Sequence, residues 1–199
     1  MVVADAGPLI HLAQIGKLHL LKKLFQNVFV TARVKVGAFD EGVRLGCADA
    51  ETIGKALSEG WLTVEPVPER LAKLAVKLAE GENISRADAE TLLLAKEKKA
   101  VLLVDDKVLS DLAKMYGLRV WSMWTILLES LSEGLIEVAD VENAINELGK
   151  KRHKLKETHA KEILEAARCV EERKTQKQPT KRSWGKDAFL DAGEATFSE

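Results

Sequence analysis

The stretch Val101-Leu102-Leu103-Val104-Asp105-Asp106 decides the expected fold, because an unbroken apolar run ends in two carboxylates. Such a run is typical of a strand buried on both faces, as in a parallel sheet. Near the amino terminus, the shorter run Val2-Val3-Ala4 ends in Asp5 in the same manner. The carboxyl ends of parallel strands face one crevice, where ligands bind. We therefore expect these acidic residues, distant in sequence, to meet at one edge of a sheet.

The remaining elements alternate in the order that is typical of an α/β domain. Short apolar segments predict further strands at Val28–Val30, Trp61–Val64 and Arg119–Trp121. Helical periodicity and capping residues predict helices after Pro8 and over about residues 17–25, 48–59, 71–81, 85–98, 107–116, 123–132 and 138–148. The order predicts a three-layer α/β/α sandwich with a mainly parallel sheet.

The chain of 199 residues suits one domain with an appendage. Its net charge of −1 is unevenly distributed: residues 1–149 carry 17 Lys/Arg against 22 Asp/Glu, whereas residues 150–182 carry 12 against 5. We expect an α/β domain over 1–149, a basic helical extension over 150–174 and a flexible polar tail over 175–199. The asymmetry indicates a polyanionic or acidic partner for the extension.

Several classes of protein are excluded by what the sequence lacks. No apolar run approaches the roughly 20 residues of a membrane span, and no signal peptide is visible, so we expect a cytoplasmic protein without a membrane partner. Cys47 and Cys169 are too few for a disulfide framework or a zinc site. There is no P-loop, no GxGxxG motif and no plausible Ser, Cys or His triad.

The acidic residues are the candidates for chemistry. Asp88 and Glu90 lie just inside a helical apolar stretch and join Asp5, Asp105 and Asp106 as the set that the fold could gather. Oxygen-only ligands suit Mg²⁺ or Mn²⁺. Clustered carboxylates repel one another unless a cation offsets their charge. A divalent cation is therefore the expected cofactor.

Each carboxylate also has a purely structural interpretation. Ser85 to Asp88 matches a capping box. Asp105 or Asp106 could cap the helix after it. Asp5 could accept hydrogen bonds from the turn after it. Glu90 could be a solvated helix residue.

The motifs together resemble the PIN-domain family, in its prokaryotic toxin-type (VapC-like) branch. The resemblance rests on Val2–Ile10, on Ala87–Ala95 and on Leu102–Lys107 with the later Leu112–Leu118, and it covers about residues 1–137. It implies a Mg²⁺- or Mn²⁺-dependent endoribonuclease in which water activated by the metal hydrolyses a phosphodiester. By position, Asp5, Asp88 and Asp106 would be metal ligands, Asp105 would complete the catalytic group, and Glu90 could substitute for Asp88. An antitoxin and a second copy of the chain are the protein partners to be considered.

Two departures from the family pattern leave an alternative open. A glutamate is expected near Val36 or Gly37, but the nearest carboxylates are Asp40 and Glu41. Either one of them serves through a shifted helix or an acidic position is missing, and the protein is then a catalytically inactive module that binds RNA or a protein. Trp121 and Trp124 stand in a segment that is usually small and rich in Gly and Thr; they could fill a core, thicken a dimer contact or stack on bases.

Basic residues near the expected site and in the extension are candidates for RNA contacts. The predicted set comprises Arg33, Lys35, Lys107, Lys150, Lys151 and Arg152. If the extension contacts RNA phosphates, affinity falls steeply with salt. Alternatively, the extension is a solvated helix with pairs such as Glu157–Lys161.

Overall fold

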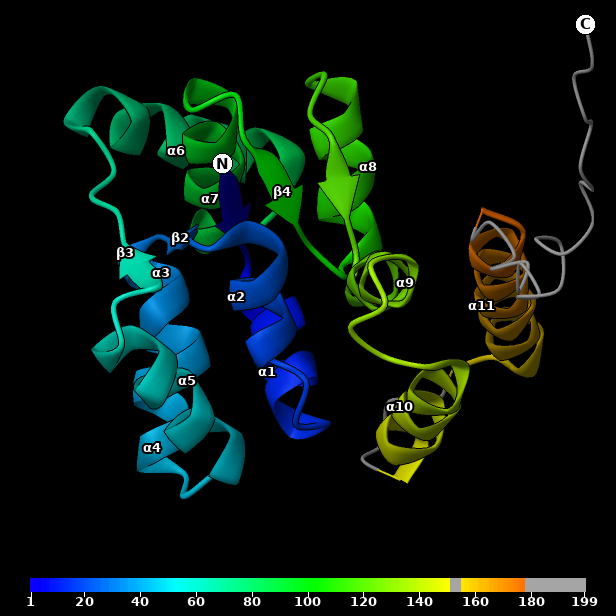
Figure 1. Ribbon diagram of the computed structural model, residues 1–199. Helices are drawn as coiled ribbons and strands as arrows, with labels where there is room; N and C mark the ends of the chain where they lie inside the picture. The colour runs from blue at the N-terminus through cyan, green and yellow to red at the C-terminus, as the bar shows by residue number, and fades with distance from the viewer. Residues whose placement is uncertain (151–154, 178–199) are drawn as a thin grey trace, which may run out of the picture.

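The computed structural model of the protein describes residues 1–150 and 155–177, and within them a single sheet of five parallel strands forms the middle layer (Figure 1). The strand order is β3-β2-β1-β4-β5, and each neighbouring pair is parallel. The strands are β1 (Val2–Ala4), β2 (Val28–Val30), β3 (Leu62–Val64), β4 (Val101–Leu103) and β5 (Val120–Trp121). All five expected strands are confirmed.

Helices connect the strands and cover both faces of the sheet. They are α1 (Ala6–Gln14), α2 (His19–Phe25), α3 (Ala32–Lys35), the π-helix η1 (Val36–Asp40), α4 (Glu41–Arg44), α5 (Ala48–Ser58), α6 (Glu69–Glu82), α7 (Arg86–Glu97), α8 (Lys107–Met115), α9 (Met123–Ser132), α10 (Val138–Lys150) and α11 (Glu157–Lys177). The predicted three-layer α/β/α fold is confirmed.

The side chains of β1 alternate between two hydrophobic cores. Val2 and Ala4 belong to the core that includes α1, α2, α5 and α9, whereas Val3 belongs to the core formed with α6, α7 and α8. Successive side chains of a strand point to opposite faces, so a short central strand contributes to both layers. With both faces covered, β1 can present a functional group only at its ends, and its carboxyl end is Asp5.

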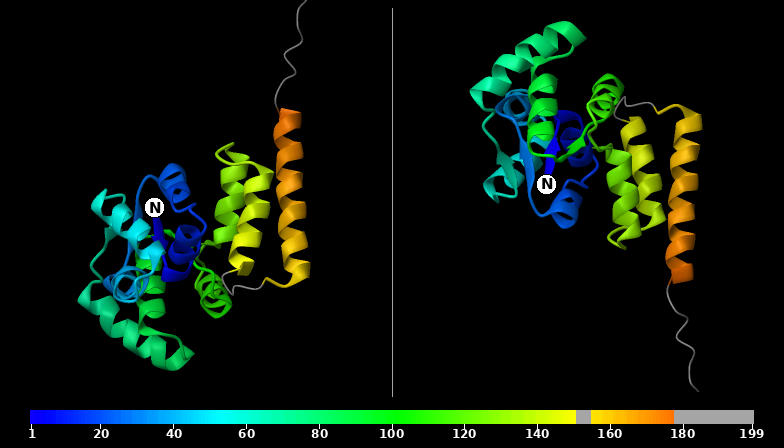
Figure 2. Two further views of the ribbon diagram at one scale, coloured as in Figure 1. Left: turned by 90° about the horizontal axis from the view of Figure 1, so that it is seen from below. Right: turned by 90° about the horizontal axis from the view of Figure 1, so that it is seen from above.

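The last three helices form a layer of their own, in which α9, α10 and α11 lie side by side (Figure 2). Ile163 and Ala167 of α11 are buried in the same core as Leu127 of α9. Helix α11 makes up most of the predicted basic extension. It is itself neutral, with five Lys/Arg against five Asp/Glu. It has the expected Glu157–Lys161 ion pair at 3.0 Å. The helix is therefore part of the folded body through its apolar face.

Two parts of the predicted carboxyl-terminal organisation lie outside the described residues. Lys151 and Arg152 fall in the gap 151–154, and most of the predicted tail, 178–199, falls after the end of α11. Within the described part, the tail's first residues, 175–177, continue α11. Lys150 ends α10, and its ammonium group donates to Glu147 at 2.7 Å.

We predict that Ala167→Glu destabilises the protein by about 3 kcal/mol, since Ala167 is fully buried and a carboxylate there would lack a partner. Urea unfolding measures the change. The matched control is Ala166→Glu, on the partly exposed neighbouring position. Equal stability of the two variants would contradict the docking of α11.

No helix among the described residues has both the length and the apolar character needed to cross a bilayer.

Candidate metal centre at the carboxyl edge of the sheet

Asp5 occupies the junction between β1 and α1. Its amide donates to the Leu103 carbonyl at 2.9 Å, which extends the pairing of β1 with β4. Its backbone is extended, and its carboxylate accepts from the Gly7 amide at 3.5 Å as the N-cap of α1. The predicted turn contact is confirmed. The carboxylate is thus fixed at a helix amino terminus on the central strand.

The pKa of Asp5 is raised above its ordinary value. Burial raises this pKa from 3.8 to about 6; hydrogen bonds from the Ala6 and Gly7 amides oppose the rise, and the negative charges of Asp88 and Asp105 add to it. Both neighbours come from other elements, α7 and the end of β4. Asp5 is therefore close enough to Asp88 and Asp105 for their charges to act on it, and the gathering of the full acidic set stays a prediction.

Asp105 is held rigidly on the β4 side of Asp5. His11 of α1 contacts one of its oxygens at 2.7 Å, and the Met123 amide at the start of α9 donates to the other at 2.8 Å. Gly7 lies between the two carboxylates, because a Cβ at Gly7 would be 3.7 Å from Asp105 Cβ and 3.8 Å from Asp5 Oδ2. Two helices, α1 and α9, therefore orient this side chain.

The role of His11 was not predicted from the sequence, although a signal was present. Gly7 and His11 are four residues apart on α1, so they share a face of the helix. Since Gly7 faces Asp105, the imidazole one turn later does so too. A histidine one turn after a glycine at the acidic end of the first strand could have indicated this contact.

Asp106 is exposed and caps α8, where its Oδ1 accepts from the Leu109 amide at 2.8 Å. The structural interpretation of this residue is confirmed. The structure thus places Asp105 beside Asp5, while Asp106 lies one residue further along the loop. A direct role of Asp106 in metal binding stays a prediction.

Asp88 combines a capping role with a place near Asp5. Ser85 Oγ accepts from the Asp88 amide at 3.0 Å, and Asp88 Oδ2 accepts from the Ser85 amide at 3.2 Å, which confirms the predicted capping box. Its charge still raises the pKa of Asp5. The two interpretations of Asp88 are therefore compatible.

Glu90 is not a solvated helix residue, and that interpretation is wrong. Its side chain is only 8% exposed, and its Oε1 accepts from Arg33 Nε at 3.0 Å and from Arg86 Nε at 3.1 Å. An unpaired buried carboxylate would be costly, so the two guanidinium groups explain its burial. Arg33, predicted to bind RNA, is therefore also an internal partner of Glu90.

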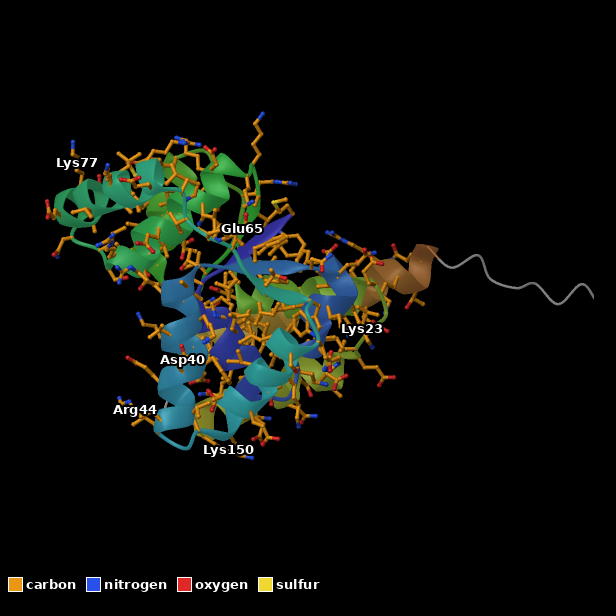
Figure 3. The ribbon with its side chains drawn as sticks, turned by 90° about the vertical axis from the view of Figure 1, so that its left-hand side faces the viewer. Lys23, Asp40, Arg44, Glu65, Lys77 and Lys150 are labelled. Carbon is orange, nitrogen blue, oxygen red and sulfur yellow. The ribbon has the colours of Figure 1, made fainter. Side chains whose placement is uncertain are left out.

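The region where a further glutamate was expected contains the π-helix η1. Val36 and Gly37 are exposed there, and Asp40 pairs with Lys35 at 2.6 Å. Figure 3 shows Asp40 and Arg44 on the same helical segment at the surface of the molecule. A π-helix inserts an extra residue and rotates the later residues around the helix axis, and such insertions are frequent at functional sites. The first carboxylate of this segment is Asp40, and it pairs with Lys35.

The carboxylate oxygens of Asp5 and its neighbours suit a hard divalent cation as ligands, but they do not enclose one. Within residues 1–150 and 155–177, no three His, Cys, Asp or Glu side chains are grouped closely enough to enclose a metal ion. Mg²⁺ commonly uses only one or two carboxylates and keeps several waters. A nearby cation would lower the pKa of Asp5 and so offset the rise. Asp5, with Asp88 or Asp105, is the set that would hold it.

The other predicted RNA-binding residues are engaged at the surface. Lys107, the first residue of α8, pairs with Asp111, and Lys35 pairs with Asp40.

Trp121 and Trp124 are partly buried against the larger core, and the Trp121 ring lies 5.3 Å from that of Phe25. Among the three interpretations of the tryptophans, these contacts favour the filling of a core.

We predict that the metal-free protein becomes less stable as pH rises from about 4 to above 6, because of Asp5. Its raised pKa of about 6 means that the folded state binds the proton more tightly than the unfolded state. The stabilisation is therefore present below pH 4 and is lost as pH rises through 6, to a limit of about 3 kcal/mol. Urea unfolding in EDTA should show that Asp5→Asn gains stability over the wild type at pH 8 but not at pH 4. A difference that does not change with pH would contradict this origin.

A doubly covered parallel sheet with partly buried carboxylates at its carboxyl edge is typical of α/β proteins that hold a ligand at that edge. The chain belongs to the DUF3368 family of PIN domains, whose family model matches residues 1–169. The match extends past residue 149 and includes the first part of α11. The PIN resemblance is thereby confirmed at the level of the family. PIN domains are in general metal-dependent nuclease folds.

Among solved structures, the chain is similar to the crystal structure of PAE2754 from Pyrobaculum aerophilum. The TM-score is 0.48 and the sequence identity 21%, over 64% of this chain and 87% of that chain. No curated protein matches the sequence.

Proposed function

We propose that the protein is a divalent-metal-dependent ribonuclease. The observation that carries the proposal is the partly buried Asp5 at the carboxyl end of the central strand, whose pKa is raised by desolvation and by the charges of Asp88 and Asp105. A bound Mg²⁺ or Mn²⁺ supplies activation of water and offsets charge that grows on a phosphate. Membership of a PIN family supports this class of chemistry.

The residues of the chain have separate tasks in this proposal. Asp5 and Asp88 provide the negative charge that attracts the cation. Asp105 keeps one orientation because His11 and the Met123 amide hold its two oxygens. Fixed charges need no reorganisation during the reaction, which is the main source of electrostatic catalysis.

Calorimetric titration with Mn²⁺, followed by incubation with a labelled single-stranded RNA, tests the proposal. We expect saturable binding of Mn²⁺ and cleavage that EDTA abolishes. The absence of both would contradict the ribonuclease.

A second candidate function is a catalytically inactive module that binds RNA or a protein. Two observations favour it. Glu90 is neutralised by Arg33 and Arg86, and positions 36 and 37 carry valine and glycine where a glutamate was expected. In this case RNA binds with equal affinity with and without Mn²⁺, and no cleavage occurs.

The toxin role and its antitoxin are finer proposals that derive from the resemblance to the toxin-type branch. They predict that expression of the wild-type chain arrests growth and that Asp5→Asn does not. Light scattering of the purified protein tests the predicted homodimer. Growth without arrest despite nuclease activity would contradict the toxin role alone.

A further inference from the structure

Arg33 and Arg86 approach one another over a buried carboxylate. Arg33 comes after β2, and Arg86 begins α7, so elements far apart in the sequence supply the pair. Both guanidinium groups use Nε to reach the same oxygen, Oε1 of Glu90, at 3.0 and 3.1 Å. Their charges total +2 against one carboxylate, so the cluster carries a net positive charge.

The way in which the arginines bind Glu90 leaves their outer ends available. A guanidinium has five N–H donors in a planar fork, of which Nε carries only one. The side chains are 47% and 44% exposed, whereas Glu90 is 8% exposed. Glu90 therefore engages only the Nε of each arginine, and both arginine side chains stay accessible to solvent.

The cluster and the candidate metal centre lie at the same edge of the sheet. β1 and β2 are neighbours, with Val3 opposite Phe29, so Asp5 and Thr31 come after adjacent strand ends. Thr31 caps α3, which presents Arg33 two residues later. On α7, Arg86 precedes Asp88 by two residues. The arginines and the carboxylates thus share one edge of the sheet.

We propose that Arg33 and Arg86 form a clamp for a phosphate of single-stranded RNA, with Glu90 as the positioning residue that presents them. Arginine forks match the geometry of phosphate oxygens and bind them in a bidentate manner. A phosphate in the clamp would place the neighbouring phosphodiester along the carboxylate edge. The inference rests on the proposed ribonuclease and names the residues that hold its substrate.

A purely structural role makes a different prediction. If Glu90 only joins α3 to α7, its loss lowers stability and leaves RNA affinity unchanged or, by removal of a negative charge, slightly higher. If Glu90 presents the clamp, Glu90→Gln weakens RNA binding although the protein becomes more positive. The two roles therefore differ in the sign of the change in affinity.

Fluorescence anisotropy of a labelled ten-nucleotide oligouridylate, measured in EDTA between 50 and 200 mM salt, tests the clamp. We expect Arg33→Ala and Arg86→Ala each to weaken binding by about tenfold and to lower the salt slope by about 0.7. Glu90→Gln should weaken binding by about threefold. Arg33→Lys, which keeps the charge but not the fork, should fall between Arg33→Ala and the wild type.

The matched control is Arg70→Ala. Arg70 also pairs with a glutamate of α7, Glu97, but at the exposed side of α6. Its replacement should leave affinity unchanged. Circular dichroism confirms that each variant is folded, and Arg33→Lys serves where an alanine variant does not fold. Binding equal to the wild type in both arginine variants, or tighter binding by Glu90→Gln, would overturn the clamp.

Failure of the clamp and failure of the ribonuclease give separate results. A wild-type protein that binds RNA through both arginines but does not cleave it with Mn²⁺ supports the clamp and contradicts the ribonuclease. A protein that cleaves RNA and whose arginine variants bind and cleave normally contradicts only the clamp.

Discussion

Asp5→Asn is expected to reduce Mn²⁺-dependent cleavage of RNA by about 100-fold or more, because it removes the charge at the centre of the candidate site. The negative charges of Asp88 and Asp105 both raise the pKa of Asp5, so Asp5 is the carboxylate whose charge a bound cation would offset. Asparagine has the same shape and can still accept a hydrogen bond from Gly7. The loss therefore reports charge and not folding.

The control for this prediction is Glu69→Gln. Glu69 is an exposed residue of α6 that pairs with Lys73, and its loss should leave the rate unchanged. Initial rates on a labelled RNA, together with Mn²⁺ affinity from calorimetry, complete the comparison. Full activity of Asp5→Asn would exclude the proposed site, and RNA binding should be preserved in EDTA.

Val36→Glu is expected to raise Mn²⁺ affinity by about tenfold, since a further carboxylate strengthens the binding of a cation that has few protein ligands. Val36 is 48% exposed at the start of η1, where the family pattern has a glutamate. Gly37→Glu is a second version of the same test, because a Cβ at Gly37 would meet no atom within 4 Å. If a missing acid limits turnover, the cleavage rate rises as well.

Val43→Glu is the matched control for the added glutamate. Val43 is 56% exposed on α4, one helical segment further along the chain. The same charge there should leave Mn²⁺ affinity unchanged. An equal increase in both variants would show only a general electrostatic effect, and no increase in either would mean that η1 does not face the cation.

The fold could be predicted from the sequence because its strands are short, continuous apolar runs with clear ends. Val101–Val104 reads as a doubly buried strand, and its acidic continuation marks the carboxyl edge. For α11 the sequence left open whether the helix packs on the body or on a partner. Its charges dominate the composition, and only Ile163 and Ala167, four residues apart, form the buried contact. A sparse apolar face is easily read as a solvated extension.

The candidate site was predicted in part. Asp5, Asp88 and Asp105 could be found from strand ends and a helix start, which local sequence reveals. The choice between Asp105 and Asp106 could not, because adjacent residues in a loop point in directions that tertiary contacts decide. Here those contacts are His11 and the Met123 amide for Asp105 and the Leu109 amide for Asp106. The burial of Glu90 depends likewise on an arginine that arrives from α3.

The Met123 amide gives the carboxyl-terminal layer a mechanical link to the acidic edge. It begins α9, and α9 packs against α11. A shift of α11 would therefore be transmitted through α9 alone to the hydrogen bond that orients Asp105. We therefore expect sequence changes in α11, more than 150 residues from Asp5, to act on the orientation of Asp105.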